Sequence, residues 1–413
     1  MKSMKLPSRR NAARLAAVAI GALVLAGCAK DAPQDTWAPA GPDAQAIHDL
    51  QWPIFLLAGI VGVIVFLVVG FSLWRFRDRG QPMPEQSHGN PIIEYTFIAI
   101  PAVLLAAISV PTVSGVIALN ETDDAECVVN VTGQQWWWEY DYPVDADGSI
   151  CGFVPNNQAA PIVTSAQLVI PTDSTVIVRT TSRDVIHSWW IPKLNGKRDV
   201  VPGRVHTWRL EASRPGIFAG QCTEFCGLSH ANMRMEVVAL YPDDFQVWLD
   251  NQLAPYTSPE PGTLAAEGEA TFIAQCSRCH QVDGLTDADG DPVIASPDQY
   301  VYSGSAPNLS NLMTRNTFAG ASFDLLTADC RAQIWDPNVD VDEFGAMYLA
   351  GVTHECLNQI DLKEWIRDAP AKKPMFADAD KLEETDGLVR GMPYLALSED
   401  QITEIVAYLE TLK

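Results

Sequence analysis

The segment Cys222-Thr-Glu-Phe-Cys226-Gly-Leu-Ser-His230-Ala-Asn-Met233 places two thiols, an imidazole and a thioether within twelve residues. Such groups are ligands that suit copper far better than magnesium or calcium. His187 lies 35 residues upstream, at the end of a strand-like run, where it can supply a second imidazole. A disulfide between Cys222 and Cys226 is the alternative in an exported domain. Because it leaves the spacing of the histidines and Met233 unexplained, we expect a metal site.

Short strand-like runs surround this segment between about residues 127 and 242, and Pro, Gly, Asn and Asp separate them. Examples are Val128–Val131, Leu168–Ile170 and Val176–Arg179. Several short strands punctuated in this way predict a β sandwich or barrel. A short helix is expected over 243–251, and the Pro- and Gly-containing stretch 258–262 reads as a linker.

Two apolar runs precede the β-rich region. Pro53–Trp74 is 22 residues without a charge, long enough to span a membrane as a helix. Tyr95–Leu119 follows, and neighbouring helices or local adjustments can accommodate its two prolines. Three arginines, at 75, 77 and 79, lie between the runs, whereas acidic residues follow the second run. By the positive-inside rule the loop is cytoplasmic and both outer ends are external.

The N-terminus has the pattern of an export signal. Lysines and arginines precede an apolar run from Leu15 to Leu25, which ends in Leu25-Ala26-Gly27-Cys28. Small residues at this point are typical of a cleavage site. The arrangement resembles the lipobox of bacterial lipoproteins, which implies cleavage before Cys28 and a lipid on its thiol. An uncleaved hydrophobic leader is the alternative.

Over about residues 50–250 the sequence resembles subunit II of the haem-copper cytochrome c oxidases. The matching stretches are Glu94-Tyr-Thr-Phe-Ile-Ala-Ile-Pro101, Gln135-Trp-Trp-Trp138, Asp184-Val-Ile-His-Ser188, Asp199-Val-Val-Pro-Gly-Arg204 and Cys222 to Met233. The resemblance implies a cupredoxin-like domain that binds two copper ions, the CuA centre. It implies bridging thiolates at Cys222 and Cys226 and terminal imidazoles at His187 and His230. It also implies weak axial ligands at Met233 and the carbonyl oxygen of Glu224.

The resemblance assigns three further roles. Trp136 matches the tryptophan through which electrons reach the copper pair, a ring expected over the copper site on its exposed side. Glu94 matches a carboxylate at the mouth of a proton pathway into subunit I. The side chain of Glu224 matches a ligand of a magnesium ion at the border with subunit I. Taken as a bare motif, consecutive tryptophans are more often packing residues.

A second motif, Cys276-Ser-Arg-Cys279-His280, is a C-x-x-C-H site for covalent attachment of haem c. Its two thiols form thioethers with the haem vinyl groups, and the histidine becomes an iron ligand. A helix is expected over 265–275. Another is expected over Glu399–Leu412, where an apolar stripe falls on Ile402, Ile405, Val406 and Leu409.

This C-terminal region resembles a class I cytochrome c, on the stretches Ala306-Pro-Asn-Leu309 and Gly391-Met392-Pro393. The resemblance makes Met392 the expected distal iron ligand, with Met375 as the main alternative. Cys127 with Cys151, and Cys330 with Cys356, are candidate disulfides in an oxidising compartment, although spacing does not prove connectivity.

Together these features predict a multidomain chain. We expect a lipoprotein-type signal peptide at 1–27, an exposed N-terminal segment at 28–52 and a transmembrane helical hairpin at 53–120. A cupredoxin-like copper domain at 121–255 and an all-α cytochrome c domain at 256–413 would follow. The protein would lie in a bacterial cell membrane, with its N-terminus and both cofactor domains on the periplasmic or extracellular side.

The resemblance implies an oxidoreductase subunit that accepts electrons through haem c and the copper pair and passes them to haem a of subunit I. Oxygen reduction and proton pumping occur in subunit I. Expected partners are subunits I and III and a cytochrome bc complex or another haem c donor. The net charge of −23 argues against nucleic acid and favours cationic partners.

Three other functions compete with this interpretation. Nitrous oxide reductase uses a similar copper motif but needs a large His-rich catalytic domain, whereas this chain has seven histidines. The structural subunit of a quinol oxidase lacks the copper ligands, all of which are present here. A lipoprotein cytochrome that acts alone as a shuttle would purify without an oxidase core.

Overall fold

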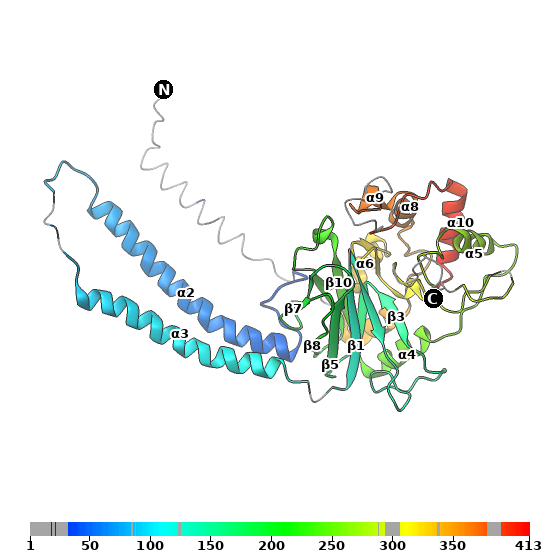
Figure 1. Ribbon diagram of the computed structural model, residues 1–413, viewed down its shortest axis with the longest axis horizontal. Helices are drawn as coiled ribbons and strands as arrows, with labels where there is room; N and C mark the ends of the chain where they lie inside the picture. Colours follow the sequence, from blue (N-terminus) through cyan, green and yellow to red (C-terminus); the bar gives the residue numbers. More distant parts are fainter. Residues whose placement is uncertain are drawn as a thin grey trace, which may run out of the picture.

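The computed structural model describes residues 18, 21, 32–83, 86, 88–122, 125–287, 289–293, 306–336, 339–377 and 390–413. Two long helices, α2 (Pro42–Arg75) and α3 (Pro91–Leu119), pack against each other and extend away from a β-rich domain (Figure 1). The C-terminal helices lie on the other side of that domain (Figure 1). Apart from residues 18 and 21, the expected signal peptide falls outside the described residues, as does Cys28.

Both long helices are apolar enough to cross a membrane. Their apolar side chains are exposed in the isolated chain, as lipid-facing residues are. Helix α3 begins at Pro91 because the side chain of Asn90 accepts a hydrogen bond from the backbone N–H of Ile92, 3.0 Å away. Pro53 lies within α2, which runs through it without ending.

The prediction of an exposed segment at 28–52 is wrong for the start of α2. The helix begins at Pro42, eleven residues before the predicted span, and Asp43 and Ala44 are buried. Asp43 forms an ion pair with Arg209 and accepts a hydrogen bond of 3.2 Å from Asn195. These contacts fix the first turn of the helix to the β-rich domain, which sequence periodicity could not reveal.

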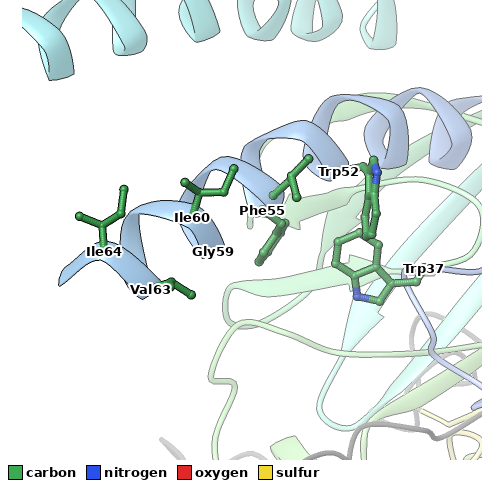
Figure 2. A pocket seen from close by; sticks show the side chains of 8 residues that line it. Trp37, Trp52, Phe55, Gly59, Ile60, Val63 and Ile64 are labelled. Carbon is green, nitrogen blue, oxygen red and sulfur yellow. The ribbon is translucent and has the colours of Figure 1, made fainter. Parts of the chain in front are cut away.

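An aromatic cluster joins the segment before α2 to the helix itself. Figure 2 shows Trp37 beside Trp52 and Phe55, and its ring centroid lies 5.8 Å and 5.2 Å from theirs. The backbone N–H of Trp37 donates to Asp35 over 2.9 Å. An apolar groove of about 550 Å³ continues from this cluster along α2 as far as Ile64 (Figure 2).

The β-rich domain contains ten strands and ends in helix α4 (Pro242–Gln252). The strands are β1 (Cys127–Gln134), β2 (Trp137–Tyr142), β3 (Ile162–Ser165), β4 (Gln167–Pro171), β5 (Val176–Ser182), β6 (His187–Trp190), β7 (Lys197–Val200), β8 (His206–Leu210), β9 (Gly216–Gln221) and β10 (Arg234–Leu240). The three predicted runs lie in β1, β4 and β5, and the predicted short helix corresponds to α4.

These strands form a five-stranded sheet in the order β3-β2-β1-β5-β8 and a three-stranded sheet in the order β4-β10-β9. Strands β6 and β7 pair separately. Strand β1 alternates buried and half-buried residues, the pattern of a sheet with one face toward a core. The core between the sheets is rich in aromatic side chains, including Trp138, Tyr140 and Trp189. The region is therefore β-rich and cupredoxin-like, as the sequence indicates.

The C-terminal region contains several short helices. Its elements are α5 (Leu264–Gln275), η2 (Leu312–Thr314), β11 (Thr317–Phe318), β12 (Phe323–Asp324), α6 (Ala328–Ile334), α7 (Val341–Leu349), α8 (Gln359–Arg367), α9 (Ala369–Lys372) and α10 (Glu399–Leu409). The prediction that the region is all-α is wrong in one respect, because β11 and β12 pair as a two-stranded sheet. The predicted apolar stripe of α10 is buried, and α10 packs against α5. Phe272 and Tyr408 meet there, with ring centroids 5.1 Å apart.

Disulfides join Cys127 to Cys151 and Cys330 to Cys356. The first ties the start of β1 to the turn after β2. The second joins α6 to the turn before α8. Both crosslinks are the pairs expected from the sequence.

Buried polar contacts connect the C-terminal region to the β-rich domain. The guanidinium of Arg315 donates to Ser165 over 3.0 Å. The side chain of Gln167 accepts from the backbone N–H of Asn316 over 2.9 Å, and Tyr348 donates to the same oxygen over 3.2 Å. All of these side chains are buried. The interface therefore resembles a protein interior rather than a loose contact between domains.

Candidate functional site

The loop between β9 and β10 carries the predicted copper ligands. The two strands pair from Gln221 with Arg234, and the backbone N–H of Cys222 donates to the carbonyl of Met233 over 2.9 Å, closing the base of the loop. Gly227 has φ +102, and a Cβ there would lie 2.8 Å from Nε2 of Gln135. Glycine is the residue that permits this turn beside a close neighbour.

The loop brings sulfur and nitrogen atoms together. The Sγ atoms of Cys222 and Cys226 are 3.7 Å apart. Nδ1 of His230 lies 3.5 Å from Sγ of Cys226, and Sδ of Met233 lies 3.8 Å from the same atom. The carbonyl oxygen of Glu224 is 3.3 Å from Sγ of Cys222. These five residues are the loop ligands that the resemblance implies.

His187 reaches the loop from another part of the chain. It is the first residue of β6, rather than the end of a strand, and its side chain is fully buried. Its Nδ1 lies 3.9 Å from Sγ of Cys222, and His187, Cys222 and Cys226 form a group that could hold a metal ion. A Cβ on Gly133 would lie 2.9 Å from Cδ2 of His187, so glycine leaves room for the ring.

The second ring nitrogen of His187 has a carboxylate partner. Nε2 lies 2.9 Å from Oδ1 of Asp184, which is itself nearly buried. Burial alone lowers the pKa of His187, but the hydrogen bonds with Asp184 and Cys222 outweigh burial and raise it. A carboxylate at the outer nitrogen of a histidine fixes the ring orientation of a metal ligand. The sequence interpretation did not single out Asp184, although it stands three residues before the histidine.

The two loop thiols perturb each other. Their hydrogen bond lowers the pKa of Cys222 and raises the pKa of Cys226. The pairing therefore favours the thiolate form at one of the two sulfurs. Coordinated thiols lose their protons, so a cation between these sulfurs would take both as thiolates.

Glu224 is exposed. It lines a polar groove of about 580 Å³ together with Lys197, Arg198, Asp199, His206 and Thr223. Its expected role as a magnesium ligand stays a prediction.

Trp136 lies beside the sulfur cluster, and its Nε1–H donates to the carbonyl of Cys226 over 3.0 Å. The expectation that its ring faces the exposed side is wrong, because only 3% of the residue is accessible. The C-terminal region covers it. The ring of Phe376 lies 5.7 Å from that of Trp136, and Nζ of Lys373 donates to the Trp136 carbonyl over 2.8 Å.

The predicted haem attachment residues follow helix α5. Cys276 is buried and Cys279 is exposed, and both are free thiols. Nδ1 of His280 lies 2.8 Å from the carbonyl of Pro307, which leaves Nε2 as the nitrogen that can ligate iron. Burial lowers the pKa of His280 and favours the neutral ring that a metal requires. Two free thiols and an oriented neutral imidazole fit covalent haem c.

The two candidate distal ligands lie on neighbouring segments. Phe376 and Arg390 form an antiparallel bridge. Met375 precedes Phe376 and Met392 follows Arg390 by two residues, so both methionines lie next to this bridge in sequence. A Cβ on Gly391 would lie 2.5 Å from Sδ of Met375. Both methionines are half-buried, and the choice of Met392 stays a prediction.

Glu94 lies in the first turn of α3 and is exposed in the isolated chain. Its expected role at a proton pathway depends on subunit I and stays a prediction.

Family models match two parts of the chain. The transmembrane domain of cytochrome c oxidase subunit II matches residues 34–114, and its periplasmic domain matches residues 127–240. Cytochrome c oxidase subunit 2 of Alkalihalophilus pseudofirmus is 32% identical over 308 residues, which cover 72% of this chain and 85% of the relative. The protein of the same name from Bacillus sp. (strain PS3) is 30% identical, with 95% of both chains covered.

Among solved structures, the periplasmic domain of subunit II of cytochrome oxidase from Bradyrhizobium japonicum is 26% identical, with a TM-score of 0.27. The match covers 32% of this chain and 96% of the solved domain. With a paired-helix membrane anchor, a β-rich external domain and a Cys/His cluster fit for a metal, the chain belongs to the cytochrome c oxidase subunit II family and is part of a haem-copper oxidase.

Proposed function

We propose that this chain is the electron-accepting subunit of its oxidase and holds two redox centres, a CuA pair and a covalent haem c. When bound, each centre takes up and releases one electron at a time, from a donor outside the membrane toward haem a of subunit I. The observation that carries the proposal is the convergence of His187 and the 222–233 loop on one sulfur cluster.

In this proposal the thiolates of Cys222 and Cys226 and the imidazoles of His187 and His230 would hold the two copper ions. Met233 and the carbonyl of Glu224 would supply two further, weaker donors. Copper accepts this mixture of thiolate, imidazole and thioether ligands. Burial of Cys222, Cys226 and Met233 and the Asp184 carboxylate would hold the ligands in place, so little would have to move when the oxidation state changes.

Cys276, Cys279 and His280 hold the haem in this proposal, with Met392 as distal ligand and Met375 as the alternative. The free thiols and the oriented His280 ring support it, and the two methionines lie on segments joined by the Phe376–Arg390 bridge. The similarity to the Bacillus sp. PS3 relative covers 95% of both chains, so the region beyond the periplasmic family model is shared by that relative.

Three further roles belong to the same proposal. The carboxylate of Glu224 binds magnesium at the border with subunit I, and Glu94 stands at the mouth of a proton pathway in that subunit. Cys28 carries a lipid after signal cleavage. Subunits I and III and a cytochrome bc complex or other haem c donor are the partners.

Absorption and metal analysis of the detergent-solubilised complex tests the proposal. About two copper ions and one covalent haem are expected per subunit II. Met392→Ala should abolish the low-spin haem spectrum, and Met375→Ala should leave it, if Met392 is the distal ligand. A complex with intact Cys222 and Cys226 but no copper contradicts the copper assignment. A complex with copper but no covalent haem contradicts only the haem assignment.

A further inference from the structure

Lys373 is a buried lysine between the C-terminal region and the loop that carries the predicted copper ligands. It is 3% exposed, and its Nζ donates to the carbonyls of Trp136 and Ala319 over 2.8 Å and 2.7 Å. One carbonyl belongs to the β-rich domain and the other to the C-terminal region. Burial lowers the pKa of Lys373 to about 7, and burying an amine is unfavourable unless its donors are satisfied, as they are here by these two carbonyls.

The residues around Lys373 close over Trp136. Ser229, inside the loop that carries the predicted copper ligands, donates its hydroxyl to the carbonyl of Pro374. The backbone N–H of Arg234 donates to the carbonyl of Gly320 over 3.1 Å. A Cβ on Gly320 would lie 2.6 Å from the Trp136 carbonyl, so this turn fits against the tryptophan without room for a side chain.

Hydrogen bonds therefore fix both the indole ring and the backbone carbonyl of Trp136. Its indole N–H donates to the carbonyl of Cys226, while its own carbonyl accepts from Lys373. Phe376, three residues after Lys373, then presents its ring to the indole at 5.7 Å and an interplanar angle of 42°. The aromatic pair therefore connects the segment that carries Met375, next to Phe376 in sequence, with Cys226, a predicted copper ligand.

We propose that Lys373 is a positioning residue that seats Phe376 against Trp136 and makes this ring pair the contact through which electrons leave the haem-bearing region. The inference rests on the proposed function, because it assumes that haem c and the copper pair are present. It goes further, since it names the contact between the two parts and the residue that fixes it. It also means that an external protein donor cannot dock on Trp136.

Lys373→Met tests whether the lysine positions Phe376 against Trp136, and Lys372→Met is the matched control. Lys372 is the adjacent lysine, but it pairs with Asp361 and Glu364 of α8 within its own region. In the purified complex, a ruthenium photosensitiser reduces haem c with a light pulse, and the near-infrared band of the copper pair follows the transfer. Lys373→Met should slow the transfer roughly ten- to a hundredfold, because small misplacements of reacting groups are that costly.

Phe376→Leu provides the second variant, which leaves the lysine in place. If Lys373 acts by seating Phe376, the double variant should be about as slow as the slower single variant. Purely additive losses, or transfer in Lys373→Met as fast as in Lys372→Met, overturn the proposal. If Lys373→Met loses either cofactor, the test depends on Phe376→Leu alone. Electron transfer in Phe376→Leu at the wild-type rate then overturns the proposed contact between the two rings. A wild-type complex without covalent haem instead contradicts the haem assignment on which this proposal rests.

Discussion

The carboxylate of Asp184 lies directly behind the His187 ring, with Oδ1 2.9 Å from Nε2. Its other oxygen accepts from the backbone N–H of Gln135 over 2.8 Å and from the guanidinium of Arg390 over 2.9 Å. One side chain therefore joins a candidate copper ligand, the turn that carries Trp136 and the C-terminal region. Its replacement should disturb all three.

Asp184→Asn keeps the shape of the side chain but removes its charge. Loss of a carboxylate partner from a ligating histidine typically weakens metal binding by about 10- to 100-fold. We therefore expect copper to leave Asp184→Asn at a correspondingly lower chelator concentration, with the haem content unchanged. Asp243→Asn, on the exposed start of α4, is the control. Equal copper retention in the two variants would show that Asp184 does not support the ligand.

The two cofactors should be separable by mutation. Cys222→Ser removes a bridging sulfur and should abolish copper binding while covalent haem remains. Cys276→Ser removes one thioether and should reduce covalent haem while copper remains. Metal analysis and a haem stain of the denatured protein measure the two contents independently. Loss of both cofactors in both variants would indicate that the regions do not load separately, contrary to the proposed function.

Local sequence was sufficient for the ligand loop. Cys222, Cys226, His230 and Met233 lie within one loop between two paired strands, so their spacing alone brings their side chains together. The buried apolar stripe of α10 could also be predicted from the sequence, because helix periodicity decides which face is buried. In both cases the information lies within a few turns of the chain.

The residues that surround Trp136 could not be predicted from local sequence. Lys373 is 237 residues away in sequence and Arg390 is 206 residues from Asp184, so no local pattern links them. Trp136 was expected on the exposed side because it matches the tryptophan through which electrons reach the copper pair in the resembled family. The C-terminal region covers it instead, and only the tertiary arrangement reveals this.

Glu236 makes the interface sensitive to pH. Burial raises its pKa above the usual value, although Arg331 and a hydrogen bond from Gln167 oppose the shift. Above about pH 4.5 the folded state then binds more protons than the unfolded state, so stability falls as pH rises through the folded pKa. The loss is at most about 1.4 kcal/mol per pH unit for one group.

Hydrogen exchange of the Asn316 amide, which donates to Gln167, reports opening of this interface. After correction for intrinsic exchange, the amide should be better protected at pH 5 than at pH 7. Glu236→Gln should flatten this dependence, although Asp324, whose pKa burial also raises, retains part of it. Glu343→Gln, at an exposed position, is the control. An unchanged dependence in Glu236→Gln contradicts the assignment.

The C-terminal region should attract a basic electron donor. Residues 256–413 contain 27 Asp and Glu residues against 10 Lys and Arg residues, a difference of 17 negative charges. Such a field accelerates association with a cationic protein, and salt screens it. Since Trp136 is covered, the donor would have to reduce the proposed haem of the C-terminal region itself. Reduction of haem c by a small basic cytochrome should slow roughly tenfold between about 0.01 M and 0.15 M salt.

Reduction by an uncharged hydroquinone is the control. Its rate should change little with salt, which separates electrostatic steering from a salt effect on the protein. A rate that is independent of salt with the basic donor would exclude an electrostatic docking surface on this region.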